Sequence, residues 1–322
     1  MAAQDATHPL WPSSWKEASG EATIKRRADP KPVKLFCGWF CPFAQRGWIA
    51  CEAKRLDYQY VEVNPYEVDS SQPGGYTKRA LPLSEKRERY PEFIAVSPRG
   101  LVPAMDKDGV AVWDSMPLVE FIDESFSGPR LFPSDAHQRA RVRIYIAHCG
   151  DYIQKPYYTM LMAQDPSQRE RAREQMLEGC RSLARAMSTD GDFFLGEQFS
   201  AFEIAIAPFW QRYLWVGSVY RGFSFPRDAD FVRLERWWSA VEKHPAVAAT
   251  LVCRERLVSS YSDYAENRGT SEYAKAIQAS LGASAASAVA RAPCVVSSRA
   301  TSSLIALAVG VALGLSIAKG RK

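Results

Sequence analysis

The pattern of apolar and polar positions divides the chain into a first part with strands and a second part with helices. Short apolar runs predict strands at residues 33–37 and 58–63, with a helix at 43–54 between them. Residues 101–105 and 110–113 predict two more strands joined by a turn, and a helix runs from there to about residue 126. We therefore predict an α/β domain over residues 33–127.

The order of these elements is that of the thioredoxin fold. The polar segment 64–89, which contains Pro73-Gly74-Gly75, interrupts this order and is predicted to be an irregular insertion. Residues 1–32 are rich in proline and carry a basic triplet, so we predict a flexible N-terminal arm.

The character of the chain changes after Gly128-Pro129. Residues 135–262 show helical periodicity without a convincing strand, and Ser200 and Glu203 form a capping box before an apolar run. This pattern predicts an all-helical second domain. Residues 263–300 are rich in Ala and Ser and are predicted to be a linker that is partly helical.

The last part of the chain is apolar. Residues 300–318 carry no charge and are followed by three basic residues. A helix of that length spans roughly 28 Å, close to the thickness of a bilayer core. We predict a transmembrane tail anchor at 301–318 that leaves the rest of the protein facing the cytosol, and a buried core helix is the alternative. Short anchors with basic ends resemble those of the outer mitochondrial or peroxisomal membrane.

Composition narrows the function classes. Basic residues exceed acidic ones by 41 to 36 and are scattered, so nucleic acid is not a predicted partner. The seven cysteines are odd in number and irregularly spaced, which indicates a reducing compartment rather than a disulfide framework. No cluster of cysteine and histidine has zinc-ligand spacing, and we predict no metal site.

Cys41 is the candidate nucleophile. Taken alone, a cysteine is more often a small buried core residue. Here it follows the first strand and precedes Pro42, which is favoured at the first position of a helix, so the helix N-terminus would favour its thiolate. Cys37 lies on the strand, and Ala44 occupies the place of a second cysteine. Such a site needs an external thiol to resolve its mixed disulfide, and glutathione is the abundant candidate.

Three ordered segments resemble the omega class of glutathione transferases. Residues 40–46 (FCPFAQR) resemble its active-site motif FCPFAxR, and residues 97–103 (SPRGLVP) resemble its NPxGLVP. Residues 113–115 (WDS) resemble its acidic residue–serine pair after the fourth strand. The resemblance covers roughly residues 33–262. It departs at Arg99, where the family usually has an aromatic residue, and in the longer segment 64–89.

The resemblance implies the glutathione transferase fold, with a thioredoxin-like domain and an all-helical domain, usually as a homodimer. It implies that Cys41 forms a mixed disulfide with glutathione. The implied glutathione-binding residues are Phe43, Val102, Pro103, Asp114, Ser115 and Arg89. Pro103 would follow a cis peptide bond, and Val102 would bind the cysteinyl part. Asp114 and Ser115 would bind the γ-glutamyl group. Lys86 and Arg89 are both candidates for the glycyl carboxylate.

The implied activity is thiol transfer and reduction with glutathione as co-substrate. Its substrates would be a mixed disulfide or a small electrophile, with dehydroascorbate reduction and weak conjugation as related reactions. Aromatic residues of the helical domain are candidates for lining a second-substrate site, with core packing as the alternative: Tyr157, Tyr158, Trp210, Tyr213, Trp237 and Trp238.

A second hypothesis is a membrane-associated protein without enzymatic activity. Chloride intracellular channel proteins share a similar Cys-Pro-Phe-x-x-Arg motif, and some tail-anchored relatives act in organelle membrane dynamics. The pair Asp114-Ser115 favours the enzyme, because it completes the set of glutathione contacts.

The tail anchor predicts a change in fractionation. A chain ending at Arg299 lacks the uncharged segment and is expected to move from the membrane pellet to the supernatant in cell lysates. Immunoblotting of the two fractions, with the full chain as control, makes the measurement. A truncated chain that stays in the pellet contradicts the anchor.

Overall fold

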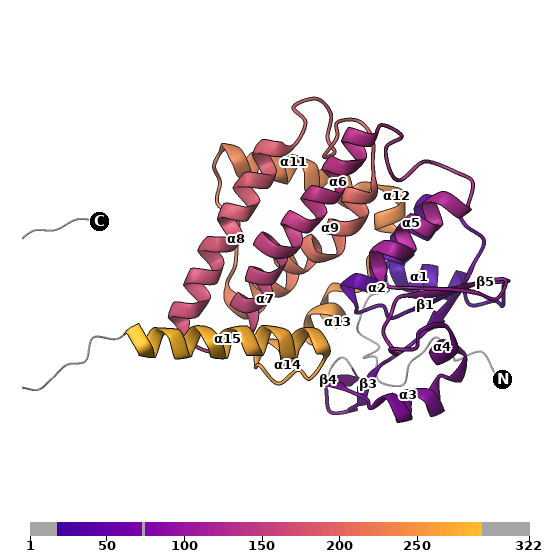
Figure 1. The fold of residues 1–322 in the computed structure, drawn as a ribbon, viewed down its shortest axis with the longest axis horizontal. Coiled ribbons are helices and arrows are strands. Elements are labelled where there is room, and N and C mark those ends of the chain that lie inside the picture. The colour runs from indigo at the N-terminus through magenta and orange to yellow at the C-terminus, as the bar shows by residue number, and fades with distance from the viewer. Residues whose placement is uncertain (1–17, 73–74, 292–322) are drawn as a thin grey trace, which may run out of the picture.

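The computed structural model describes residues 18–72 and 75–291, with side chains as far as residue 283. A four-stranded sheet in the order β2-β1-β5-β6 forms the first domain (Figure 1). β1 pairs in parallel with β2 and antiparallel with β5, and β5 pairs antiparallel with β6. These strands are β1 (Val33–Cys37), β2 (Gln59–Glu62), β5 (Ala104–Lys107) and β6 (Val110–Trp113).

Helices cover both faces of this sheet. Successive residues of β1 point to opposite faces, so its apolar side chains need a covering layer on each side. Leu35 belongs to the large core with α2 (Pro42–Ala53) and α5 (Ser115–Ser125). Its neighbour Phe36 packs instead with Phe93 of α4 (Pro91–Val96). The predicted thioredoxin-like domain is confirmed.

The second domain is helical, as predicted. Its long helices pack side by side (Figure 1), and Ser200 and Glu203 form the predicted capping box at the start of α9. Turns of π-helix follow α6 (η1, Gly150–Gln154) and α9 (η2, Tyr213–Gly217). The helices are α6 (Ala136–Cys149), α7 (Lys155–Met162), α8 (Pro166–Ala186), α9 (Ala201–Arg212), α10 (Ser218–Arg221), α11 (Ala229–Lys243), α12 (Pro245–Ala248), α13 (Arg254–Ser259) and α14 (Ser262–Ala265).

The end of the predicted N-terminal arm is a packed helix, α1 (Ser19–Arg26). Glu21 is buried and accepts hydrogen bonds from the Cys253 backbone N–H at 3.0 Å and from Arg256 at 3.3 Å. The prediction of a flexible arm over residues 1–32 is therefore wrong for α1, because a long-range ion pair and backbone contacts hold it against the second domain. Residues 1–17 lie outside the described part.

The segment 64–89 also differs from its prediction as an irregular insertion. It contains a two-stranded sheet of β3 (Tyr66–Val68) and β4 (Tyr76–Ala80), followed by α3 (Leu83–Arg89). The backbone of β4 bonds to the second domain: Lys78 N–H donates to Asp263 at 2.7 Å and Thr270 N–H donates to Lys78 O at 2.9 Å. These partners are distant in sequence, so the polar composition did not reveal them.

Most of the predicted linker is the helix α15 (Glu272–Arg291), which runs across the foot of the helical domain in Figure 1. Ala274 and Ile277 are buried in the core, so the first half of α15 is part of the folded body. Within residues 18–72 and 75–291, no helix is both long and apolar enough to cross a membrane. The predicted anchor at 301–318 lies outside the described residues.

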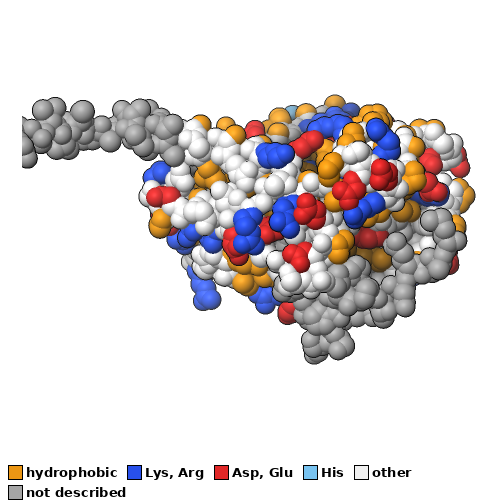
Figure 2. Space-filling view, turned by 90° about the horizontal axis from the view of Figure 1, so that it is seen from below, with side chains coloured by type: hydrophobic (Ala, Val, Ile, Leu, Met, Phe, Trp, Pro, Cys, Tyr) orange, Lys and Arg blue, Asp and Glu red, His pale blue; other side chains and the backbone are white. Residues whose placement is uncertain are grey.

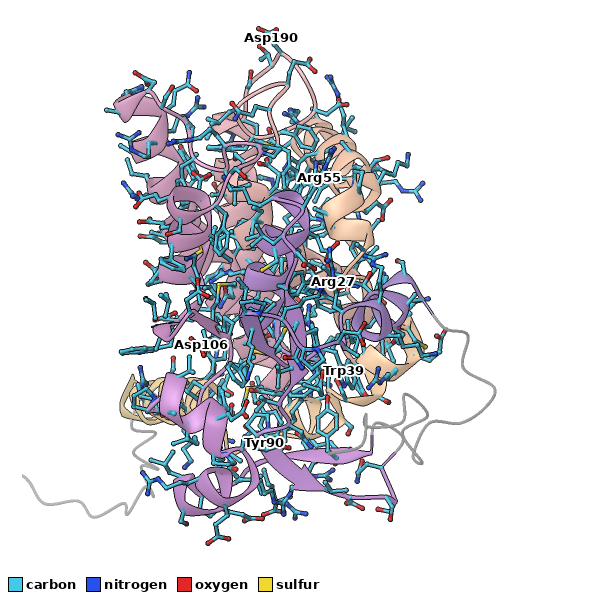
Figure 3. The ribbon with its side chains drawn as sticks, turned by 90° about the vertical axis from the view of Figure 1, so that its right-hand side faces the viewer. Arg27, Trp39, Arg55, Tyr90, Asp106 and Asp190 are labelled. Carbon is cyan, nitrogen blue, oxygen red and sulfur yellow. The ribbon has the colours of Figure 1, made fainter. Side chains whose placement is uncertain are left out.

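Charged side chains are mixed over the surface. Figure 2 shows basic and acidic residues interspersed on the face that it presents, and no field of one sign stands out there. Figure 3 shows how far the folded part extends, with Asp190 on the loop after α8 at one end and Tyr90 near the other.

Asp123 ties α5 to the connection between the domains. Its buried carboxylate accepts hydrogen bonds from the backbone N–H groups of Leu131 at 2.8 Å and Phe132 at 3.0 Å, and from Lys54 at 3.1 Å. Burial works to raise the Asp123 pKa, but these hydrogen bonds and the Lys54 charge outweigh burial, and the pKa lies below its ordinary value.

Substituting Asp123→Asn is expected to lower the free energy of unfolding at pH 7 by about 3 kcal/mol, because Lys54 loses its buried counter-charge. A carboxylate with a lowered folded-state pKa stabilises the fold above its unfolded pKa, and this stabilisation is lost as pH falls through the folded pKa. The difference between wild type and variant should therefore shrink from about pH 4 downward. Urea titrations at several pH values measure it.

The matched control is Asp108→Asn, which removes an exposed partner of Lys107 and should change stability by less than about 1 kcal/mol. An Asp123→Asn variant as stable as the wild type at pH 7 would contradict the structural role.

Candidate functional site

Cys41 lies at the N-terminus of α2, as predicted. It is the N-cap residue in an extended conformation, and Pro42 begins the helix. The loop is closed by a hydrogen bond from Cys41 N–H to Gly38 O at 2.9 Å. The side chain is half-buried and lines a cavity of about 380 Å³. The Cys41 side chain makes no capping hydrogen bond with the first helical turn, and its sulfur is open to the cavity.

The other cysteines of the described residues are buried. Cys37 is 0% exposed, and burial raises its pKa well above the ordinary value against an opposing hydrogen bond with Tyr60. Burial likewise raises the pKa of Cys51, Cys149 and Cys180. Within the described part, Cys41 is therefore the thiol with access to a reaction partner.

A smaller cavity of about 100 Å³ adjoins the large one. It is lined by Phe43, Arg99, Leu101, Val102, Pro103, Trp113, Asp114 and Ser115. The structure thus brings together five of the six predicted binding residues, and Phe43, Leu101 and Val102 line both cavities. The Val102–Pro103 peptide bond is cis, as predicted.

Asp114 and Ser115 begin α5 at the edge of this small cavity. The Asp114 carboxylate accepts a hydrogen bond from Ser115 N–H at 2.5 Å, and Asp114 adopts a positive φ of 74°. An acidic residue rarely adopts such a conformation without a structural or functional reason. The arrangement offers a carboxylate beside a helix N-terminus, so one end of the cavity suits a cation and the other suits an anion.

Arg46 holds the Ser115 side chain by a hydrogen bond. It is buried, donates to Ser115 Oγ at 3.1 Å and to Ala205 O of α9 at 2.9 Å, and its guanidinium lies over the rings of Phe43 and Phe209. Burial lowers the pKa of Arg46 to about 10, and the nearby Tyr213 and Cys41 oppose this shift. Arg46 is the last residue of the FCPFAQR motif, and the structure places it at the domain interface.

Arg89 does not join the other predicted binding residues. Its exposed side chain pairs with Glu85 on α3, and it lines neither cavity. The geometry gives no support to its predicted contact with the glycyl carboxylate. The alternative, Lys86, is buried and donates to Gly100 O at 3.1 Å, also outside both linings. Lys86 and Arg89 lie one turn apart on α3, and one is buried while the other is exposed. Polar composition alone does not predict which of the two is buried.

Lys78 is the basic residue that sequence analysis missed. It comes from β4, lines the large cavity with Cys41 and is 2% exposed. The only sequence signal was a lysine inside a short alternating run, YTKRA, and that pattern is common on exposed strands.

The large cavity is mainly aromatic. Its rings are Phe40, Phe43, Tyr66, Tyr158, Tyr261, Tyr264 and Tyr273. Of the six aromatic residues proposed from sequence, Tyr158 alone lines this cavity. Trp210 and Trp237 pack together in the core, which was the alternative. Tyr273 was missed because it belongs to the predicted linker, where a tyrosine in an Ala/Ser-rich segment was the available signal.

Arg212 holds the Cys41 loop from the second domain. Its guanidinium is fully buried and donates to Phe40 O at 3.0 Å, to Gln45 at 3.0 Å and to Tyr261 at 2.7 Å. The site is therefore built by both domains. The described residues contain no group of three or more His, Cys, Asp or Glu side chains that could hold a metal ion.

Comparison with known families matches this architecture. A glutathione S-transferase N-terminal domain model matches residues 40–125, and a glutathione S-transferase C-terminal domain model matches residues 166–249. Together they span more than half of the chain and coincide with the α/β and helical domains. The chain belongs to the glutathione S-transferase family.

Omega-class proteins are among its relatives. The solved structure of glutathione transferase Omega 3C from Trametes versicolor is 29% identical, with a TM-score of 0.61, and the match covers 74% of this chain and 97% of that one. Glutathione S-transferase L3 of Arabidopsis thaliana is 28% identical over 74% of this chain and 93% of its own. A probable glutathione transferase omega-2 of Caenorhabditis briggsae is 23% identical over 73% and 85%.

The burial of the cysteines predicts selective modification. Iodoacetamide at pH 8 should alkylate Cys41 at least about 100-fold faster than Cys37 in the folded protein, because Cys37 needs an opening of the fold to react. Peptide mass spectrometry over a time course measures both rates. In guanidinium chloride the two rates should become similar, and equal rates in the folded protein would contradict the described burial.

Proposed function

We propose that this chain is a glutathione-dependent thiol transferase and reductase with Cys41 as its nucleophile. One observation supports this most strongly: among the cysteines that the structure describes, the accessible one lies at a helix N-terminus and opens onto a cavity that adjoins the cluster around Asp114 and Ser115. The similarity to omega-class glutathione transferases supports glutathione as the co-substrate.

In this proposal the small cavity binds the γ-glutamyl end of glutathione. The α5 N-terminus and Ser115 receive its carboxylate, and Asp114 pairs with its ammonium. Val102, which lines both cavities, offers its backbone to the cysteinyl part. Glutathione bound in this way brings its sulfur from the small cavity to Cys41 in the large one.

The reaction has two displacement steps. The Cys41 thiolate attacks the glutathionyl sulfur of a mixed disulfide R–S–SG, so that the Cys41–SG bond forms and the sulfur–sulfur bond of the substrate breaks. R–S⁻ leaves and becomes a thiol after protonation. A glutathione thiolate then attacks the glutathionyl sulfur on Cys41. Glutathione disulfide leaves, the Cys41 thiolate is restored, and the substrate has been reduced by one glutathione.

The large cavity accepts the second substrate. Its apolar rings favour an aromatic or aliphatic mixed disulfide or a small electrophile over a strongly hydrated one. Dehydroascorbate reduction and weak conjugation belong to the same proposal. Conjugation is expected to be weak because a cysteine stores glutathione as a disulfide. A homodimer and membrane attachment through residues 301–318, at the outer mitochondrial or peroxisomal membrane, also remain proposals.

Substituting Cys41→Ser should abolish glutathione-dependent reduction of a mixed disulfide, because a serine hydroxyl does not form the intermediate disulfide. Cys37→Ser, the matched control, should keep most of the activity, because Cys37 is buried on β1 and lines neither cavity. The assay follows glutathione disulfide formation with a glutathionylated peptide as substrate. Full activity of Cys41→Ser would refute the mechanism, and equal loss in both variants would refute the single-cysteine assignment.

A further inference from the structure

Lys78 lies inside a cage of aromatic rings beside Cys41. Its Nζ lies 4.4 Å from the centre of the Phe40 ring, and four tyrosine rings complete the cage. Their centres lie at 4.9 Å (Tyr66), 5.1 Å (Tyr76), 5.2 Å (Tyr261) and 5.9 Å (Tyr264). Aromatic faces attract an ammonium group and so keep this buried amine able to carry charge.

This ammonium has no directly bonded acidic partner in the part of the chain that the structure describes, and Asp263 acts on it only through its charge. Its Nζ makes no hydrogen bond or ion pair with a described residue, although Lys78 is 2% exposed. Besides tyrosines, the cavity lining contains two groups that can become negative, Cys41 and Glu272. Glu272 is 65% exposed and pairs with Arg99 at 2.7 Å. The Cys41 thiolate is therefore the anion that Lys78 can serve inside the cavity.

The backbone of Lys78 is fixed on both sides. Its N–H donates to the Asp263 carboxylate and its carbonyl accepts from Thr270, so β4 is attached to the segment around α14, beside it in Figure 1. The side chain lies over the Phe40 ring and lines the cavity. This attachment positions an amine from the first domain with groups of the second.

Burial and the neighbouring charges bring the Lys78 pKa close to physiological pH. Burial lowers its pKa to about 7, the neighbouring Cys41 raises it, Arg212 lowers it, and Asp263 raises it. Asp263 is itself engaged by Arg268 at 2.8 Å. The four caging tyrosines have pKa values raised by burial and stay neutral near pH 7.

We propose that Lys78 is a second catalytic residue of the reaction proposed above: its ammonium stabilises the Cys41 thiolate and protonates the leaving thiolate. This proposal rests on the proposed function. In the first displacement, R–S⁻ takes a proton from the Lys78 ammonium and leaves as R–SH. The neutral amine then takes the proton of glutathione, whose thiolate attacks the Cys41–SG disulfide. Glutathione disulfide leaves, and the thiolate and ammonium are both restored.

The test measures the pH dependence of Cys41 alkylation, which requires no glutathione turnover. Lys78→Met keeps the length of the side chain among the rings and removes the charge. The pH midpoint of Cys41 alkylation by iodoacetamide should rise by about one unit or more in this variant. Lys107→Met is the matched control: it removes a lysine of β5 that lies over the Phe126 ring, outside the cavity, and should leave the midpoint unchanged.

Two results would overturn the proposal. One is the same alkylation midpoint in folded Lys78→Met and wild type, with folding checked by circular dichroism; Lys78→Gln, which keeps a polar group, is the second variant if Lys78→Met does not fold. The other is a wild-type midpoint at the ordinary thiol value of about 8.5. A shifted midpoint in a protein without turnover would instead refute the proposed function and leave the Lys78–Cys41 pairing intact.

Discussion

Two buried arginines, exchanged between the domains, hold the site together. Arg212 of the helical domain donates to the loop that carries Cys41, and Arg46 of the α/β domain donates to α9 and to Ser115. Burying a guanidinium costs several kcal/mol unless its N–H groups are satisfied. The protein meets this requirement with backbone carbonyls, Gln45 and Tyr261. The two domains are therefore locked in one relative position at the point where the thiol lies.

The cavity over Cys41 depends on elements that the basic thioredoxin order does not contain. β4 supplies Lys78, and α15 supplies Tyr273, whose ring contacts those of Phe43 and Tyr158. The main-chain hydrogen bond from Thr270 to Lys78 joins the two additions. The added parts thus surround the thiol with aromatic rings, and in such low-dielectric surroundings a nearby amine has a large electrostatic effect on sulfur.

The two cavities divide the chemistry by polarity. The small one ends at Asp114 and the N-terminus of α5, and it suits a zwitterion. The large one is lined mainly by aromatic and apolar side chains, and Lys78, Cys41, Ser271 and Glu272 are its other members. The two cavities share a wall, which is formed by Phe43, Leu101 and Val102. A tripeptide extending from one cavity to the other would present its sulfur at this wall.

The sequence by itself determined the α/β domain, the helical domain and the position of Cys41. Local patterns suffice for these features: alternation places β1, Pro42 begins α2, Asp114 caps α5, and Ser200 and Glu203 cap α9. Short segments carry these signals within a few residues. The motif order also brought five of the six predicted binding residues to one cavity.

Only the tertiary structure decided what long-range contacts create. Glu21 folds α1 onto Arg256, the hairpin β3–β4 bonds to the distant Asp263, and Lys78 enters the site while Arg89 remains on the surface. The local sequence around a polar or small residue does not show whether the residue belongs to a linker, an insertion or an active site. Its role follows from partners far away in the chain, and their positions are set by how the two domains pack.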